Sequence, residues 1–236
     1  TNNDKIGGRG KKKLETDVSI FAKRSNLNCL KVDDLNTTNF LNKIKSFKAE
    51  LFIVISYKIL PKEIFSIPKY GTVNIHASLL PNYRGAAPIQ RSLINGDKKL
   101  GLTSFLITTK IDAGKIIDNL TFNINDKITY GESHDILAEK SGSFILHTIQ
   151  KLKSGIYLRP SNRKVTQANK ILKSEYRISL DNSSFVVHNQ FRGLTPPGPH
   201  LLFNNRRVKL FETYYINKNS FNIKKGSWVI ENDKLY

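Results

Sequence analysis

The sequence predicts an α/β protein with a mostly parallel β-sheet, followed by a smaller, mainly β unit. Residues 51–56 form a continuous apolar run of strand length, which is typical of a parallel strand covered on both faces. Further strand candidates alternate with segments in which apolar residues recur at helical spacing. A polar stretch containing Gly155 and Pro160 begins near Ser154 and indicates a linker between two units.

The N-terminal part of the chain combines a basic loop with two helices. Residues 5–13 contain three glycines and five cations, so we expect a loop whose backbone carries few side chains that could pack. Apolar residues at helical spacing predict helices within 18–24 and 37–48. The run at 51–56 then forms the first predicted strand.

Two more strands and two helices complete the predicted sheet and its cover. The segments 72–76 and 102–108 have the length and apolar content of strands. Pro88 opens a short helix that ends near Asn95, because proline suits a first helical turn and Asn-Gly favours a turn. Residues 131–152 carry one apolar stripe and predict the longest helix.

The last third of the chain predicts a helix at 185–191 and strands at 207–215 and 227–236. The three prolines of Thr195–Pro199 exclude regular structure between them. We therefore expect a catalytic domain at 1–153, a linker at 154–170 and a C-terminal β domain at 171–236. Residues 154–236 hold 14 basic and 5 acidic side chains, which suits a unit that binds nucleic acid.

Charge and composition limit the partners and the compartment. The chain has 38 Lys and Arg residues against 19 Asp and Glu, a formal net charge of +19. This charge favours a polyanionic partner, although a Lys-rich and Asn-rich composition can also produce it. No apolar run approaches the roughly 20 residues of a membrane-spanning helix. The single cysteine, Cys29, and the lack of an apolar N-terminal segment predict a cytoplasmic protein.

Asn74, His76 and Asp112 stand where predicted strands give way to polar loops. Asn74 and His76 are two residues apart, so their side chains share one face of a strand. Ligands of open α/β sheets bind at the carboxyl ends of strands, where His76 emerges. An amide, an imidazole and a carboxylate suit transfer of an acyl group to an amine, and capping of backbone groups is the alternative. The spacing of the five histidines predicts no metal site.

Residues 74–90 read Asn-Ile-His-Ala-Ser-Leu-Leu-Pro-Asn-Tyr-Arg-Gly-Ala-Ala-Pro-Ile-Gln. They closely resemble the methionyl-tRNA formyltransferases, in which Asn-x-His-x-Ser-Leu-Leu-Pro is the folate-associated signature and Arg-Gly-Ala-Ala-Pro-Ile-Gln is its continuation. The segment 111–114, Ile-Asp-Ala-Gly, resembles the Asp-x-Gly turn of that family, and residues 8–12 resemble its basic loop. The order and approximate spacing of these motifs match over nearly the whole chain.

The resemblance implies a formyltransferase fold, with a Rossmann-like sheet and a C-terminal OB-like barrel. It implies formyl transfer from 10-formyltetrahydrofolate to the α-amino group of methionine on initiator tRNA, for translation initiation, by a monomeric enzyme that needs no metal and has no membrane partner. The implied catalytic residues are Asn74, His76 and Asp112. The implied donor site is Ser78, Leu79, Leu80 and Pro81, and the implied tRNA contacts are Arg9, Lys11, Lys12 and Lys13.

The sequence departs from the family pattern at several places. The family begins with a strand and a glycine turn ahead of the basic loop, so we expect a sheet without its first strand. The C-terminal domain is expected to be shortened. Lys58 follows Ser56 and Tyr57 where the family has glycine, which places a cation near the expected folate pocket. An aromatic residue is missing between the prolines of 195–199.

Two other functions stay open. Relatives that formylate a glycinamide ribonucleotide or an amino sugar share Ser-Leu-Leu-Pro and the implied catalytic residues, but they usually lack Ala-Ala-Pro-Ile-Gln and the basic loop. The third reading is an RNA-binding protein with a vestigial folate site. Tetrahydrofolate binding set beside RNA binding separates this reading from both enzymes.

Overall fold

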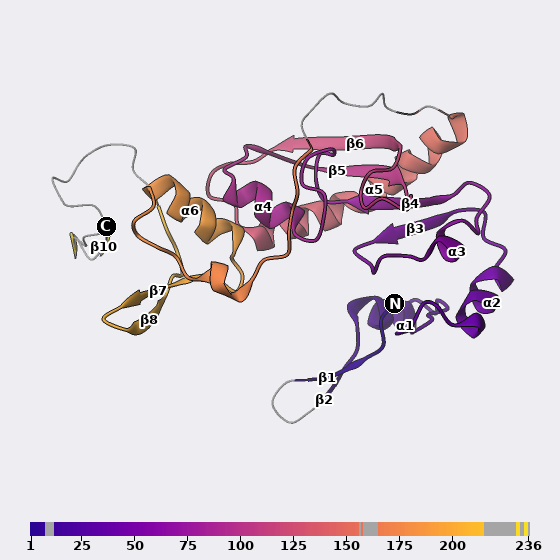
Figure 1. Cartoon of the computed structure of the whole chain (residues 1–236), viewed down its shortest axis with the longest axis horizontal. Helices are drawn as coiled ribbons and strands as arrows, with labels where there is room; N and C mark the ends of the chain where they lie inside the picture. Colours follow the sequence, from indigo (N-terminus) through magenta and orange to yellow (C-terminus); the bar gives the residue numbers. More distant parts are fainter. Residues whose placement is uncertain (8–11, 156, 158–164, 215–229, 232–233, 236) are drawn as a thin grey trace. The chain divides into compact units, whose positions relative to one another are not determined.

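A computed structural model of the protein describes residues 1–7, 12–155, 157, 165–214, 230–231 and 234–235 (Figure 1). The chain divides into two compact units, Thr1–Asn74 with Leu106–Thr109 and Ile75–Phe105 with Lys110–Tyr236. Helices alternate with the strands of a four-stranded sheet in the order β3-β4-β5-β6, which confirms the α/β class.

The first unit contains the N-terminal helices and the start of the sheet. Thr16 and Thr37 cap its two longer helices, because each hydroxyl accepts a hydrogen bond from a backbone N–H three residues later. Both helices lie where apolar spacing predicts them. The elements are β1 (Lys5–Gly7), β2 (Lys12–Leu14), α1 (Asp17–Arg24), α2 (Thr38–Ser46), β3 (Phe52–Ile55), α3 (Lys62–Phe65) and β4 (Thr72–His76), whose last two residues belong to the second unit.

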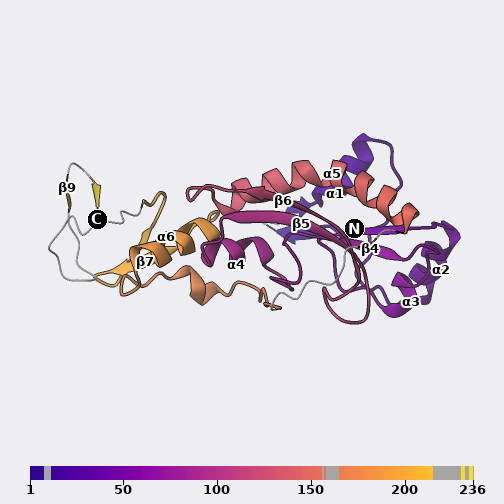
Figure 2. The same ribbon diagram turned by 90° about the horizontal axis from the view of Figure 1, so that it is seen from above.

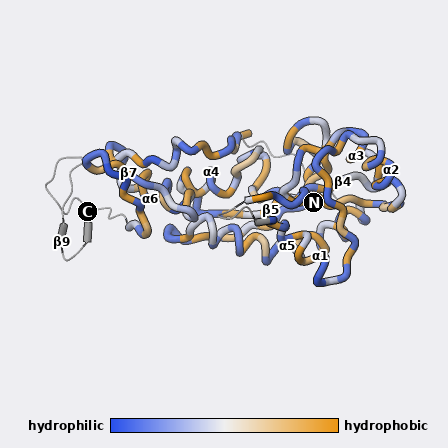
Figure 3. The backbone as a smooth tube through the Cα atoms, turned by 90° about the horizontal axis from the view of Figure 1, so that it is seen from below, coloured by the Kyte–Doolittle hydropathy of each residue, from blue (hydrophilic) through white to orange (hydrophobic). Residues whose placement is uncertain are grey.

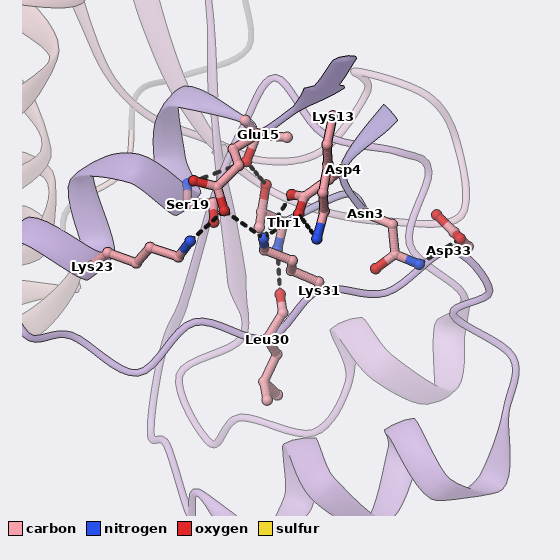
Figure 4. A network of polar contacts seen from close by, with 11 residues as sticks. Thr1, Asn3, Asp4, Lys13, Glu15, Ser19, Lys23, Leu30, Lys31 and Asp33 are labelled. Atoms are coloured by element: carbon pink, nitrogen blue, oxygen red, sulfur yellow. Dashed lines mark hydrogen bonds and ion pairs between the residues drawn. The ribbon is translucent and has the colours of Figure 1, made fainter. Parts of the chain in front are cut away.

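The expectation of a loop over 5–13 is wrong at both ends, where β1 and β2 pair as a short antiparallel hairpin. Residues 8–11 between them lie outside the described chain. At the base of the hairpin the Asp4 carboxylate accepts a hydrogen bond of 2.6 Å from the Lys31 ammonium and lies 3.2 Å from Nζ of Lys13 (Figure 4). The hydrogen bond from Lys31 is the main cause that lowers the pKa of Asp4. Lys31 also lies 3.5 Å from the carboxylate of Glu15, which in turn contacts Lys23. These ion pairs tie the hairpin to the segment around Lys31.

The second unit holds the rest of the sheet and the remaining helices. Its elements are α4 (Pro88–Ile94), β5 (Lys99–Leu106, whose last residue belongs to the first unit), β6 (Ile116–Asn123), α5 (Tyr130–Ser154), the 3-10 helix η1 (Lys173–Tyr176), α6 (Ser184–Gly193), β7 (His200–Phe203), β8 (Arg206–Lys209), β9 (Ile230–Glu231) and β10 (Lys234–Leu235).

Strand β6 is an addition to the sheet that the sequence predicts. It pairs antiparallel with β5, with Leu100 opposite Phe122, so the sheet is mixed. Beyond its buried start, residues of β6 alternate between exposed and partly buried positions. The sequence pattern does not predict β6, because a half-exposed strand with Asp118 and Asn119 lacks the continuous apolar run of a covered parallel strand.

Helix α5 runs along β6 in the second unit (Figure 2). Thr129 and Glu132 form a capping box at its start, and it ends at Gly155 in the left-handed conformation. Hydrophobic and hydrophilic residues alternate along it, as its colours show in Figure 3, and Leu137 and Phe144 are among its buried residues. The sequence pattern at 131–152 therefore predicts this helix correctly.

Helices α4 and α6 pack closely against each other in the second unit. A Cβ at Gly193 would lie 2.6 Å from the Ile94 side chain, so glycine permits this close approach. The helix predicted at 185–191 is confirmed as part of α6. The strand expected at 207–215 ends at Lys209, and the OB-like barrel stays a prediction, since residues 215–229 lie outside the described chain. Among the described helices, none is long and apolar enough to cross a membrane.

Candidate active site

His76 is buried at the end of β4, with both ring nitrogens close to oxygen atoms. Its Nε2 lies 2.8 Å from the backbone carbonyl oxygen of Tyr83. A carbonyl oxygen can only accept, so this hydrogen bond requires the proton on Nε2. Its Nδ1 lies 3.8 Å from Oδ2 of Asp112. In neutral His76 the lone pair of Nδ1 therefore faces the carboxylate.

Asp112 is also held by a backbone group. Its Oδ2 accepts a hydrogen bond of 2.8 Å from the N–H of Gly85. The residue has a φ of 47°, a left-handed conformation that aspartate adopts more readily than bulkier residues. The turn Ile-Asp-Ala-Gly thus directs the carboxylate toward both Gly85 and His76.

The loop at residues 83–85 contacts both side chains through its backbone. Tyr83 and Gly85 have positive φ values of 59° and 122°. Such a conformation is costly for a bulky residue such as Tyr83, and it persists only where neighbouring contacts enforce it. Burial, followed by a hydrogen bond to Asp97, raises the pKa of the Tyr83 hydroxyl.

Asn74 lies two residues before His76 on the same strand, β4. The alternation of side chains along a strand places these two residues on one face of it. The strand over 72–76 has the bounds that the sequence predicts. The structure thus brings His76 and Asp112 together, and Asn74 is placed by its strand position.

The Ser-Leu-Leu-Pro segment after His76 is fixed by a small network. The Ser78 hydroxyl donates to the carbonyl oxygen of Asn82 at 2.7 Å. Thr103 donates its hydroxyl to the Ser78 carbonyl at 2.6 Å and accepts from the Leu80 N–H at 3.1 Å. Leu80 and Pro81 are buried, which anchors this segment in the protein interior.

A cavity of about 350 Å³ lies beside this loop, within the range of small-molecule sites. Ser78 and Leu79, two of the four residues predicted to bind the donor, form part of its wall. Buried Leu80 and Pro81 do not line it. Its lining comprises Ser78, Leu79, Asn82, Tyr83, Ser92, Asp97, Lys98, Lys99, Leu100 and Gly101.

Of the predicted RNA-contacting residues, Arg9 and Lys11 lie outside the described residues. Lys12 is described as the β2 residue opposite Gly7. Lys13 is largely exposed and pairs with Asp4. The structure does not test the predicted RNA contacts, which stay a prediction.

Lys58 has a defined contact within the first unit. Its ammonium donates to the backbone carbonyl oxygen of Asp33 at 2.7 Å. The neighbouring Tyr57 has a raised pKa, mainly because of burial and also because of the nearby Asp33 carboxylate. The Lys58 ammonium, which departs from the family pattern, is thus hydrogen-bonded to a backbone carbonyl group.

Sequence reasoning missed the backbone groups that hold the pair. The Tyr83 carbonyl and the Gly85 N–H are common to every residue type, so no motif displays them. One signal was available, because Gly85 stands in the Arg-Gly-Ala-Ala motif. A Cβ at Gly85 would lie 2.9 Å from the carbonyl oxygen of Ala168, and its φ is one that favours glycine.

Comparison with known proteins decides the family. A family model described as formyl transferase matches residues 1–149, and one described as formyl transferase, C-terminal domain, matches 170–235. The methionyl-tRNA formyltransferase of Syntrophomonas wolfei is 33% identical over 97% of this chain and 79% of its own length. That of Clostridium novyi is 36% identical over 93% of this chain and 73% of its own length. The chain belongs to the methionyl-tRNA formyltransferase family.

This formyltransferase also shares its fold with solved structures. A sugar 3N-formyl transferase, WlaRD, solved in the presence of dTDP and 5-N-formyl-THF, is 22% identical with a TM-score of 0.62. The match covers 92% of this chain and 76% of that one. The similarity confirms the formyltransferase fold, and the curated relatives show that the chain is a formyl-transferring enzyme.

Proposed function

We propose that this formyltransferase moves the formyl group of 10-formyltetrahydrofolate to the α-amino group of methionine on initiator tRNA. The observation that carries the proposal is the identity of 33 to 36% with proteins named methionyl-tRNA formyltransferase, over nearly all of this chain. A folate donor also suits the fold, since the similar sugar enzyme was solved with a formyl-tetrahydrofolate.

The pair of His76 and Asp112 suits the proton transfer that the reaction requires. The attacking amine must lose a proton as its nitrogen bonds to the formyl carbon. Because Nε2–H of His76 donates to Tyr83, the Nδ1 lone pair is the basic position on the ring. Nδ1 lies 3.8 Å from Oδ2 of Asp112, so a proton taken up at that nitrogen faces the carboxylate. Asp112 can also accept the proton through a water molecule.

We propose that the side-chain N–H of Asn74 donates a hydrogen bond to the formyl oxygen, which becomes negative as the amine attacks. A donor of this kind commonly contributes about 3 to 4 kcal/mol to the transition state. Because Nε2–H of His76 is used by Tyr83 and Nδ1 faces Asp112, Asn74 is the side-chain donor that we propose for this oxygen. The bond from the formyl carbon to the folate nitrogen then breaks, and that nitrogen takes up the proton lost by the amine, so tetrahydrofolate leaves as a neutral amine. Ser78 and Leu79 are proposed to contact the donor, with Leu80 and Pro81 supporting their loop.

The tRNA is proposed to meet the basic hairpin, through Arg9, Lys11, Lys12 and Lys13, and the basic C-terminal part. This assignment gives part of the net charge of +19 a role in phosphate contacts. It divides the chain into a catalytic domain at 1–153, a linker at 154–170 and a tRNA-binding domain at 171–236. We also propose that the enzyme works as a monomer in the cytoplasm.

The deciding experiment offers the purified protein 10-formyltetrahydrofolate and three acceptors in parallel. Formylation of methionyl initiator tRNA, with none of an amino-sugar nucleotide or glycinamide ribonucleotide, supports the proposal. Formylation of the amino-sugar nucleotide alone would assign the acceptor class of the similar sugar enzyme instead. RNA binding without tetrahydrofolate binding would favour the vestigial site.

A further inference from the structure

A short segment beyond the catalytic domain holds the loop that contacts His76 and Asp112. The N–H of Arg84 donates to the Thr166 carbonyl at 2.9 Å, and the N–H of Ala168 donates to the Arg84 carbonyl at 2.6 Å. The Ala87 N–H donates to the Ala168 carbonyl at 3.0 Å. Residues 166–168 thus pair with the loop like a short parallel strand, although the expected linker includes them.

The same segment explains how the loop keeps its unfavourable backbone conformation. Tyr83 and Gly85 both have positive φ values, which need neighbouring contacts to persist. Ala168 lies so close that a Cβ at Gly85 would meet its carbonyl oxygen at 2.9 Å. The guanidinium of Arg91 donates to the carbonyls of Asn169 and Lys170, so the segment is itself anchored to α4.

The Thr166 side chain is linked to His76 through the backbone of Tyr83. Its Oγ1 accepts a hydrogen bond of 2.8 Å from the Tyr83 N–H. The carbonyl oxygen of the same Tyr83 accepts from Nε2 of His76 at 2.8 Å. The two bonds fix Tyr83 on both sides, so the orientation of the imidazole depends on the Thr166 hydroxyl.

We propose that Thr166 is a positioning residue, which sets the orientation of His76 through the backbone of Tyr83. Residues 166–168 lie between the two stretches matched by the family models, 1–149 and 170–235. The catalytic role of His76 rests on the proposed function, but the effect of Thr166 on the His76 ring does not.

The test compares Thr166→Val, which removes the acceptor oxygen at similar volume, with Thr166→Ser, which keeps it. Thr121→Val changes an exposed threonine of β6 and is the matched control. The first readout is the ¹⁵N spectrum of the His76 ring, assigned with His76→Asn. We expect T166V to shift the Nε2 signal and T166S and T121V to leave it as in the wild type.

The second readout is the kinetics of methionyl-tRNA formylation. A misplaced imidazole should lower kcat by roughly 10- to 100-fold in T166V and change its pH profile, while KM for tRNA stays within about twofold. T166S should keep kcat and the pH profile near those of the wild type. If T166V fails to fold, Thr166→Ala removes the same oxygen with a smaller side chain and gives the same test.

Unchanged His76 signals in the folded valine or alanine variant would overturn the positioning role. If the wild type forms no formyl-methionyl-tRNA while T166V still shifts the His76 signal, the proposed function fails and the inference about Thr166 stands. A shift of equal size in the His76 signal of T121V would also contradict the positioning role of Thr166.

Discussion

The backbone N–H of Gly85 donates a hydrogen bond of 2.8 Å to Oδ2 of Asp112. Two residues earlier, the Tyr83 carbonyl accepts from His76. The loop at residues 83–85 therefore contacts His76 at one end and Asp112 at the other. The conformation of this loop helps to set the distance of 3.8 Å between Nδ1 of His76 and Oδ2 of Asp112. The chemistry assigned to His76 and Asp112 depends on this backbone as much as on the side chains.

Gly85→Ala should damage both stability and activity. The φ of 122° is unfavourable for alanine, and its Cβ would meet the Ala168 carbonyl oxygen at 2.9 Å. We expect a loss of roughly 1 to 3 kcal/mol in the free energy of unfolding, measured by urea denaturation. Gly142→Ala is the matched control, because a Cβ there meets nothing within 4 Å, and it should stabilise α5 by up to about 1 kcal/mol. Equal stability of the two variants would argue against a strained loop.

Asp112→Asn should remove the basic carboxylate while keeping an oxygen that accepts from Gly85. We expect kcat for formylation to fall by at least about 100-fold, the usual contribution of a proton-transferring group. Thermal unfolding should change little, because the shape is kept. His76→Asn should cause a loss of similar order, and the double variant should lose less than the product of the two single losses. Wild-type turnover in either single variant would remove that residue from the mechanism.

The ion pair of Arg91 and Glu175 should make stability depend on pH. Two hydrogen bonds join the guanidinium to the carboxylate, and the bond to Arg91 is the main cause that lowers the pKa of Glu175. A lowered pKa in the folded state stabilises the fold above the unfolded pKa of about 4.5, and this contribution disappears as the pH falls through the lower folded value.

We therefore expect Glu175→Gln to lower the free energy of unfolding by up to about 1 kcal/mol at pH 7, since both groups are partly exposed. The difference from the wild type should shrink steadily below pH 4.5. Urea titrations of both proteins across this range measure it. A difference that is constant with pH would show that the ion pair is not its source.

Replacement of Arg9, Lys11, Lys12 and Lys13 by alanine should weaken tRNA binding and flatten its dependence on salt. Each lost phosphate contact lowers the slope of log K against log salt by nearly one. The control replaces four exposed lysines elsewhere in the first unit, Lys43, Lys45, Lys48 and Lys62, with the same change in charge. An equal change of slope in both variants would mean that net charge, and not the hairpin, attracts the RNA.

Much of the fold is readable from local patterns. The apolar run at 51–56, the alternation at 72–76 and the stripe of 131–152 each predict an element that the structure contains. Strand β6 is not predicted from the sequence, because its exposed positions carry polar residues. The pairing of His76 with Asp112 follows from the motifs, whereas the contribution of Thr166 arises from pairing across 83 residues of sequence, which no local pattern reports.

The most direct test of the account is a single-turnover assay with methionyl initiator tRNA and 10-formyltetrahydrofolate. The wild-type protein should produce formyl-methionyl-tRNA, and Asp112→Asn should bind both substrates with affinities near those of the wild type while forming product at least about 100-fold more slowly. No product from a folded wild-type protein that binds both substrates, or equal rates in the two proteins, would contradict it.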